Sequence, residues 1–121
     1  MNFELFTDFG RGYRPTSSIR TNGQLGFNRG SIHRFGLSDG YAQLFYDREA
    51  KIIGVKPVSD DSLPGATRFV VKSNNAFISA RSLLEYYGIV YREKTRAYEA
   101  SWDECEKMIL VDLNKPIRKE E

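Results

Sequence analysis

Six basic side chains have the chemistry needed to bind a phosphate or the edge of a nucleic-acid base. They fall in two stretches of the chain, and they are Arg14, Arg20, Arg29, Arg34, Lys72 and Arg81. A guanidinium donates two parallel hydrogen bonds, a geometry that fits phosphate oxygens and the acceptor edge of guanine. These residue types therefore favour recognition of nucleic acid rather than the making or breaking of bonds.

The chain has a small net charge of +2, but segments of positive and negative charge alternate along it. Residues 1–36 carry a net +3, residues 37–67 carry −2, residues 68–96 carry +4, and residues 97–121 carry −3. The pattern indicates two similar halves, each basic first and acidic second. A binding surface with so few charges should be salt-sensitive, with log K falling by about 0.9 per unit of log salt for each phosphate contacted.

Few residues in the chain are suited to catalysis or to holding a cofactor. His33 and Cys105 are the single histidine and the single cysteine, which makes a Cys/His metal cluster or a Ser-His-Asp triad difficult to assemble. Asp103, Glu104 and Glu106 fall in a predicted hairpin turn, where carboxylates are usually solvated. No phosphate-binding loop, dinucleotide fingerprint or metal motif occurs in the sequence. We therefore expect a protein that is not an enzyme and that binds no metal or cofactor.

Aromatic residues are concentrated in the second half of the sequence. Neighbouring helix positions point about 100° apart, so only one of Tyr86 and Tyr87 can face a core. The remaining ring, Tyr86 or Tyr87, together with Tyr91 and Tyr98, could anchor a protein partner or stack on unpaired bases. Both alternatives stay open, with Tyr86, Tyr91 and Tyr98 as the candidate partner-binding residues.

Hairpin signals position the basic residues. Asn22-Gly23 lies between predicted strands at 18–20 and 25–27, and this dipeptide is typical of a type I′ turn with two positive φ angles. Gly26 within the second strand indicates a bulge or a close approach to the backbone. In the second half, the strands at 69–72 and 76–78 flank a Ser-Asn-Asn turn.

A short helix should follow each of these hairpins. Asn28 should cap the first, which ends at Gly36 in the left-handed conformation. Ser79 should cap the second, which runs through Tyr87 and stops at Gly88.

A second hairpin then completes each half, and the two halves align with one another. These hairpins comprise residues 41–46 with 52–57, and residues 96–102 with 108–113. A shift of 52 positions aligns the first hairpins and helices, and a shift of 56 aligns the second hairpins. Tyr46-Asp47 then matches Trp102-Asp103.

The two halves should form one domain over residues 1–121, because a unit of about 45 residues cannot bury enough apolar surface alone. We expect an α+β fold, mostly β, of two pseudo-repeated strand-strand-helix-strand-strand halves. The expected boundaries are an arm at 1–16, half one at about 17–58, a connector at 59–66, half two at about 67–114, and a tail at 115–121.

The run from Gly23 to Leu37, Gly-Gln-Leu-Gly-Phe-Asn-Arg-Gly-Ser-Ile-His-Arg-Phe-Gly-Leu, resembles the signature of AbrB-like, swapped-hairpin domains. A Ser-Asp-Gly turn and a second hairpin follow it through Val58, as in that family. The resemblance implies two units interleaved about a two-fold axis in a small barrel, made within one chain as in MraZ-like relatives. It also implies DNA binding, and it carries that role to Arg20, Arg29 and Arg34.

The resemblance predicts a DNA-binding protein, either a small transcriptional regulator or an antitoxin-like repressor. The alternatives are a non-enzymatic subunit that binds a protein partner and a single-stranded nucleic-acid binder that uses exposed tyrosines. No apolar run approaches the roughly 20 residues of a membrane span, and one cysteine suits a reducing compartment. We therefore expect a cytoplasmic monomer or homodimer with no membrane partner.

Overall fold

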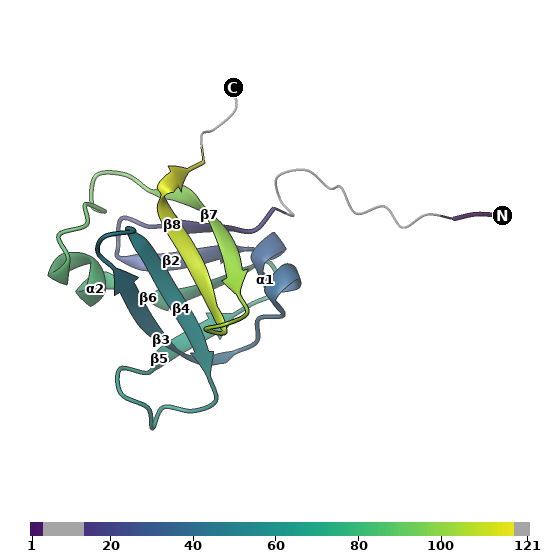
Figure 1. The fold of residues 1–121 in the computed structure, drawn as a ribbon, viewed down its shortest axis with the longest axis horizontal. Coiled ribbons are helices and arrows are strands. Elements are labelled where there is room, and N and C mark those ends of the chain that lie inside the picture. Colours follow the sequence, from purple (N-terminus) through teal and green to yellow (C-terminus); the bar gives the residue numbers. More distant parts are fainter. Residues whose placement is uncertain (4–13, 118–121) are drawn as a thin grey trace.

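The computed structural model describes residues 1–3 and 14–117 (Figure 1). Most of the expected N-terminal arm and the end of the expected tail lie outside these residues. The elements are β1 (Thr16–Ile19), β2 (Gln24–Asn28), α1 (Arg29–Phe35), β3 (Gly40–Asp47), β4 (Ile52–Val58), β5 (Thr67–Val71), β6 (Asn75–Ser79), α2 (Arg81–Tyr86), β7 (Arg96–Asp103) and β8 (Met108–Pro116). No helix among the described residues is long and apolar enough to cross a membrane.

The eight strands form a closed antiparallel barrel in the order β1-β2-β6-β5-β3-β4-β8-β7. The mostly β, α+β architecture expected from the sequence is therefore confirmed. The pairing is the same for both halves: β1 pairs with β7 as β5 pairs with β3, while β2 pairs with β6 and β4 with β8. Closure leaves neither half with an unpaired sheet edge. Figure 1 shows α1 and α2 on opposite sides of the barrel.

The second hairpins of the two halves have the same register and the same turn. Asp47 pairs with Ile52 as Asp103 pairs with Met108. Lys51 and Lys107 both take positive φ, 58° and 57°. Each of these lysines donates its backbone N–H to the carbonyl oxygen of the preceding turn aspartate at 2.7 Å. The equivalence inferred from the 56-residue shift thus extends to the backbone conformation.

The core fills the inside of the barrel with side chains from both halves. Strand alternation directs Leu25 and Phe27 of β2 inward, and both are almost fully buried. Phe27 meets Phe69 of the other half edge to face, with ring centroids 5.7 Å apart. Because both halves contribute to the same core, neither could bury its apolar residues without the other.

Helix α1 begins and ends as its sequence predicts. The Asn28 side-chain oxygen accepts a hydrogen bond from the Ser31 backbone N–H at 2.9 Å and another from the Thr16 N–H at 3.0 Å. Gly36 ends the helix with a φ of 61°. The cap therefore joins the start of α1 to the start of β1.

The predicted type I′ turn between β1 and β2 is wrong. Only Gly23 has positive φ there, at 88°, and Asn22 is not among the described non-glycine residues with positive φ. The Gly23 N–H donates to the Arg20 carbonyl oxygen and the Arg20 N–H to the Gln24 carbonyl oxygen, both at 2.9 Å. This is a three-residue loop with glycine in the left-handed position. A Cβ at Gly23 would lie 2.6 Å from Cβ of Arg81, so the turn also packs against α2.

The predicted cap of the second helix is also wrong. Ser79 is the last residue of β6, where it pairs with Gln24, and Ala80 precedes α2 without a side-chain cap. The Ala80 N–H instead donates to the Gly23 carbonyl oxygen at 2.9 Å. Strand pairing with the other half thus takes the residue that local propensity would place at the helix end.

Replacing Lys51 or Lys107 by glycine should stabilise the protein by up to about 1 kcal/mol. The left-handed conformation costs an L-residue roughly 1–2 kcal/mol, and the extra chain entropy of glycine offsets about half of that gain. Urea unfolding should show similar increases for both variants because the two turns match. Lys56→Gly, inside β4, is the control and should lower stability by roughly 1 kcal/mol. A gain in one turn variant with a loss in the other would contradict the equivalence of the turns, and a loss in both would contradict the argument from backbone strain.

Candidate nucleic-acid interface

The outer surface of the β2–β6 pair, with the adjoining ends of β1 and β5, forms a face that we call the β2–β6 face. Its centre is the pair Gly26 and Phe77. Leu25 pairs with Ile78 on one side of it, and Phe27 pairs with Ala76 on the other. A two-fold rotation about the centre that swaps β2 with β6 therefore maps each of these residue pairs onto the other. A pseudo-two-fold axis therefore passes through the Gly26–Phe77 pair.

The side chain of Arg20 lies over the centre of the β2–β6 face. Its guanidinium carbon is 6.0 Å from the centroid of the Phe77 ring. Its Nη1 donates to Oε1 of Gln24 at 3.1 Å. A Cβ at Gly26 would lie only 2.5 Å from Nη2 of Arg20, so the guanidinium covers backbone that is accessible because residue 26 is glycine. The close approach expected at Gly26 is that of the Arg20 side chain.

Lys72 occupies the position equivalent to Arg20 on the other side of the axis. The Lys72 N–H donates to the Asn75 carbonyl oxygen at 2.8 Å, as the Arg20 N–H donates to that of Gln24. Lys72 is exposed. The 52-residue shift thus brings two predicted site residues to matching ends of β1 and β5.

Two further predicted residues begin the helices beside this face. Arg29 starts α1 directly after Asn28, which pairs with Asn75. Arg81 starts α2 against the β1–β2 turn at Gly23. Four of the six predicted basic residues therefore belong to the elements that surround the Gly26–Phe77 pair.

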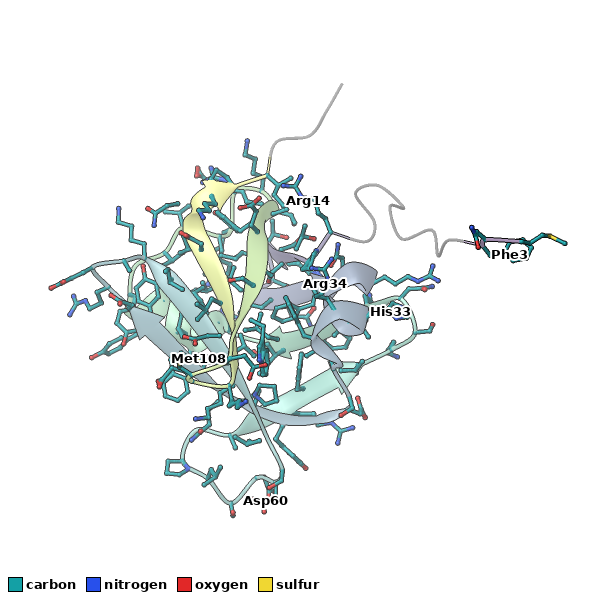
Figure 2. The ribbon with its side chains drawn as sticks, turned by 45° about the vertical axis from the view of Figure 1, so that its right-hand side comes forward. Phe3, Arg14, His33, Arg34, Asp60 and Met108 are labelled. Atoms are coloured by element: carbon teal, nitrogen blue, oxygen red, sulfur yellow. The ribbon has the colours of Figure 1, made fainter. Side chains whose placement is uncertain are left out.

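The other two basic residues lie beside β7. Nη2 of Arg14 contacts Oε1 of Glu99 at 3.0 Å, so its charge is paired. Arg34, in the last turn of α1, lines a shallow groove of about 540 Å³ together with Trp102 and Glu104 of the second half. Figure 2 shows Arg14 and Arg34 near one another beside α1. Arg14 and Arg34 therefore lie beside β7 rather than beside the Gly26–Phe77 pair.

The prediction that Tyr91 and Tyr98 are spare surface rings is wrong. Tyr91 is 6% exposed and Tyr98 is 9% exposed. Tyr98 is buried because strand alternation along β7 directs it, like Ala100, into the core of the barrel. Tyr86 alone fits the expectation, with 81% of its surface exposed.

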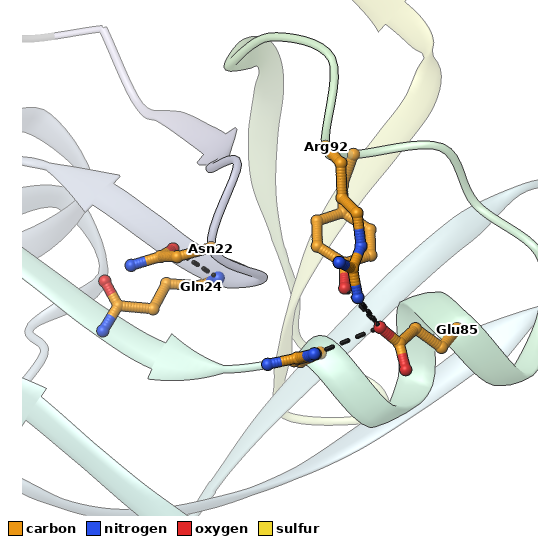
Figure 3. Close-up of polar contacts among 6 residues, drawn as sticks. Asn22, Gln24, Glu85 and Arg92 are labelled. Atoms are coloured by element: carbon orange, nitrogen blue, oxygen red, sulfur yellow. Dashed lines mark hydrogen bonds and ion pairs between the residues drawn. The ribbon is translucent and has the colours of Figure 1, made fainter.

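Glu85 of α2 gathers three donors, shown in Figure 3. Tyr91 donates its hydroxyl to Oε2 of Glu85 at 2.5 Å, Nη2 of Arg92 donates at 2.7 Å, and Nε of Arg81 at 3.3 Å. The Tyr91 hydrogen bond, followed by those from the two arginines, lowers the pKa of Glu85 to about 2. The cluster ties the segment after α2 to the helix, and it offsets part of the positive charge of Arg81.

Sequence reasoning missed Gln24 and Phe77 as members of the site. Phe77 reaches Arg20 only through the β2–β6 pairing, which no local pattern indicates, whereas Gln24 lies four residues from Arg20 in the same hairpin. Among the described residues, no group of three or more His, Cys, Asp or Glu side chains could hold a metal ion. Neither a family model, nor a curated protein, nor a solved structure matches the chain.

Glu85→Gln should lower stability near neutral pH and should have a smaller effect in acid. The pKa of Glu85 falls from an ordinary 4.5 to about 2 on folding, so the ionised group stabilises the fold fully above pH 4.5. That contribution is lost as the pH falls through about 2. Urea midpoints of the wild type and the variant should therefore converge between these pH values. Glu49→Gln, in the exposed β3–β4 turn, is the control, and an equal convergence there would contradict the assignment.

Proposed function

We propose that the protein binds duplex DNA through the β2–β6 face, as a small transcriptional regulator or antitoxin-like repressor. The observation that carries the proposal is the equivalent placement of Arg20 and Lys72 on both sides of the Gly26–Phe77 pair. Duplex DNA has local two-fold symmetry relating its strands, and protein two-folds commonly match it. A basic face with this symmetry can contact both backbones at once.

The strand pairing supports a swapped-hairpin barrel of the AbrB-like or MraZ-like kind as the finer description of the fold. The first hairpin of each half lies between strands of the other half, through the β1–β7, β2–β6 and β3–β5 pairs. A short helix separates the two hairpins in each half. These features, with the resemblance of the Gly23–Leu37 run, make this family the best model for the chain.

The distribution of charge supports the same face. The second hairpins meet through β4 and β8, and in the strand order this pair lies diametrically opposite β2 and β6. The second hairpins carry net charges of +1 (residues 40–58) and −2 (residues 96–116), against +4 and +2 for the first hairpins with their helices (residues 14–36 and 67–88). The outward residues of β2 and β6 include Gln24, Asn28, Asn75 and Ser79, which are polar and uncharged. Amides and hydroxyls can donate to phosphates without repelling them. The excess of positive charge in the first hairpins and their helices gives DNA one preferred side of the barrel.

Tyr86 supports the alternative functions, which are a non-enzymatic protein-interaction subunit or a single-stranded nucleic-acid binder. It is 81% exposed and contacts Tyr87 edge to face, with centroids 4.9 Å apart. Val90 nearby in sequence is 61% exposed. An exposed ring of this kind could anchor a partner or stack on a base.

Fluorescence anisotropy with duplex DNA across a salt series tests the proposal. Arg20→Ala and Lys72→Ala should each weaken binding and reduce the slope of log K against log salt by about 0.9 for each phosphate contact removed. Lys56→Ala, on β4 of the opposite wall, is the matched control and should leave the slope unchanged. Absence of duplex binding at low salt, or equal effects of all three variants, would overturn the proposal.

Tyr86→Ala separates the alternatives in the same assay. A duplex binder should keep its affinity in this variant because Tyr86 lies on α2 away from the Gly26–Phe77 pair. A greater loss for single-stranded DNA with Tyr86→Ala than with Arg20→Ala would favour base stacking instead. A protein that ignores both kinds of DNA and co-purifies with another chain would favour the interaction subunit.

A further inference from the structure

The two sides of the β2–β6 face are equivalent in position but unequal in chemistry. Arg20 on one side corresponds to Lys72 on the other. Arg20 pairs with Gln24 across a three-residue turn, and Lys72 pairs with Asn75 across a turn that is one residue shorter. Gly26 and Phe77 each lie two residues after that pair, so they are equivalent positions, and they also pair with one another. One side thus has an arginine with glycine at the position beneath it, and the other has a lysine with phenylalanine at the matching position.

The Arg20 guanidinium is held in place before any ligand binds. Its guanidinium carbon lies 6.0 Å from the centroid of the Phe77 ring, and the Gln24 side chain accepts from Nη1 at 3.1 Å. Gly26 provides the space for Nη2. A guanidinium has five N–H donors, and the Gln24 bond uses one of them. Because its position is already restricted, Arg20 loses less conformational freedom on binding than a free arginine would.

A pre-positioned guanidinium is suited to reading a base. Two of its remaining N–H groups can bond to O6 and N7 of guanine in the major groove, which is the most common base-specific contact. Lys72 differs, because its ammonium is a point charge on a flexible stem and fits a phosphate without selecting a base. The two half-sites under the face would therefore be recognised by different means.

We propose that one chain recognises a non-palindromic duplex site, in which Arg20 reads a guanine on one side of the pseudo-axis and Lys72 anchors a phosphate on the other. This inference rests on the proposed function. Gly26 acts in it as a positioning residue, because any larger side chain there would displace the guanidinium. In this arrangement Arg20 provides sequence specificity, and Lys72 provides affinity that does not depend on sequence.

Selection of bound sites from a randomised duplex pool by the full chain tests the inference. The wild type should enrich a site with a strong guanine preference in one half only. Measured on the enriched site, replacing that guanine should cost about 5-fold to 150-fold in affinity. Arg20→Lys should largely abolish that preference while keeping the salt slope. Lys72→Ala should lower the salt slope by about 0.9 and keep the preference.

Gly26→Ala tests the positioning role. Its Cβ would lie 2.5 Å from Nη2 of Arg20, which is the far end of a flexible side chain, so the barrel can keep its fold as the guanidinium moves. The guanine preference should fall as it does in Arg20→Lys, with the affinity for scrambled duplex retained. A thermal melt confirms that the variant folds, and should it not fold, Arg20→Lys and Arg20→Met carry the test.

The outcomes distinguish the two proposals. A palindromic selected site, or a guanine preference that survives both Arg20→Lys and Gly26→Ala, overturns the asymmetric reading and leaves duplex binding standing. Failure of the wild type to bind any duplex at low salt overturns both. A one-sided guanine preference that depends on Arg20 supports both.

Discussion

The pairing of β2 with β6 is the contact on which the rest of the structure depends. It joins the two halves through five residue pairs, from Gln24 with Ser79 to Asn28 with Asn75. It also places the two first hairpins side by side, and this aligns Leu25, Phe27, Ala76 and Ile78 toward one core. With β4–β8 on the opposite wall, it closes the barrel. Neither half contains a complete sheet, so stability and the candidate interface arise from the same interaction.

The two halves of the barrel resemble one another more closely in their backbone pairing than in their surface side chains. Inside, both halves supply apolar residues at alternate strand positions, because a shared core requires similar volumes at matched places. Outside, the shared core does not constrain the side chains, and Arg20 differs in chemistry from Lys72 as Gly26 differs from Phe77. A chain with two related halves can change one half alone, which a symmetric homodimer cannot do.

Local signals in the sequence predicted much of the secondary structure, and non-local pairing explains most of the errors. Asn28 and Gly36 marked the ends of α1 correctly because caps depend on neighbouring residues. Ser79 was misassigned because its pairing with Gln24, 55 residues away, overrides its preference for a helix cap. Tyr98 is a predicted surface candidate, but the closed barrel places it in the core that the two halves share. The Arg20–Phe77 contact at the centre of the candidate site could not be predicted for the same reason.

The mostly exposed loop of residues 59–66, between β4 and β5, is the covalent link between the two halves. Strand pairing, rather than this loop, holds the barrel closed, since every inter-half ladder lies elsewhere. The loop works as a tether that keeps the effective concentration of each half high near the other. If this loop were cut, the barrel would form by association of two separate chains, and the amount formed would depend on protein concentration. Fusion of the halves therefore turns a bimolecular association into an intramolecular one.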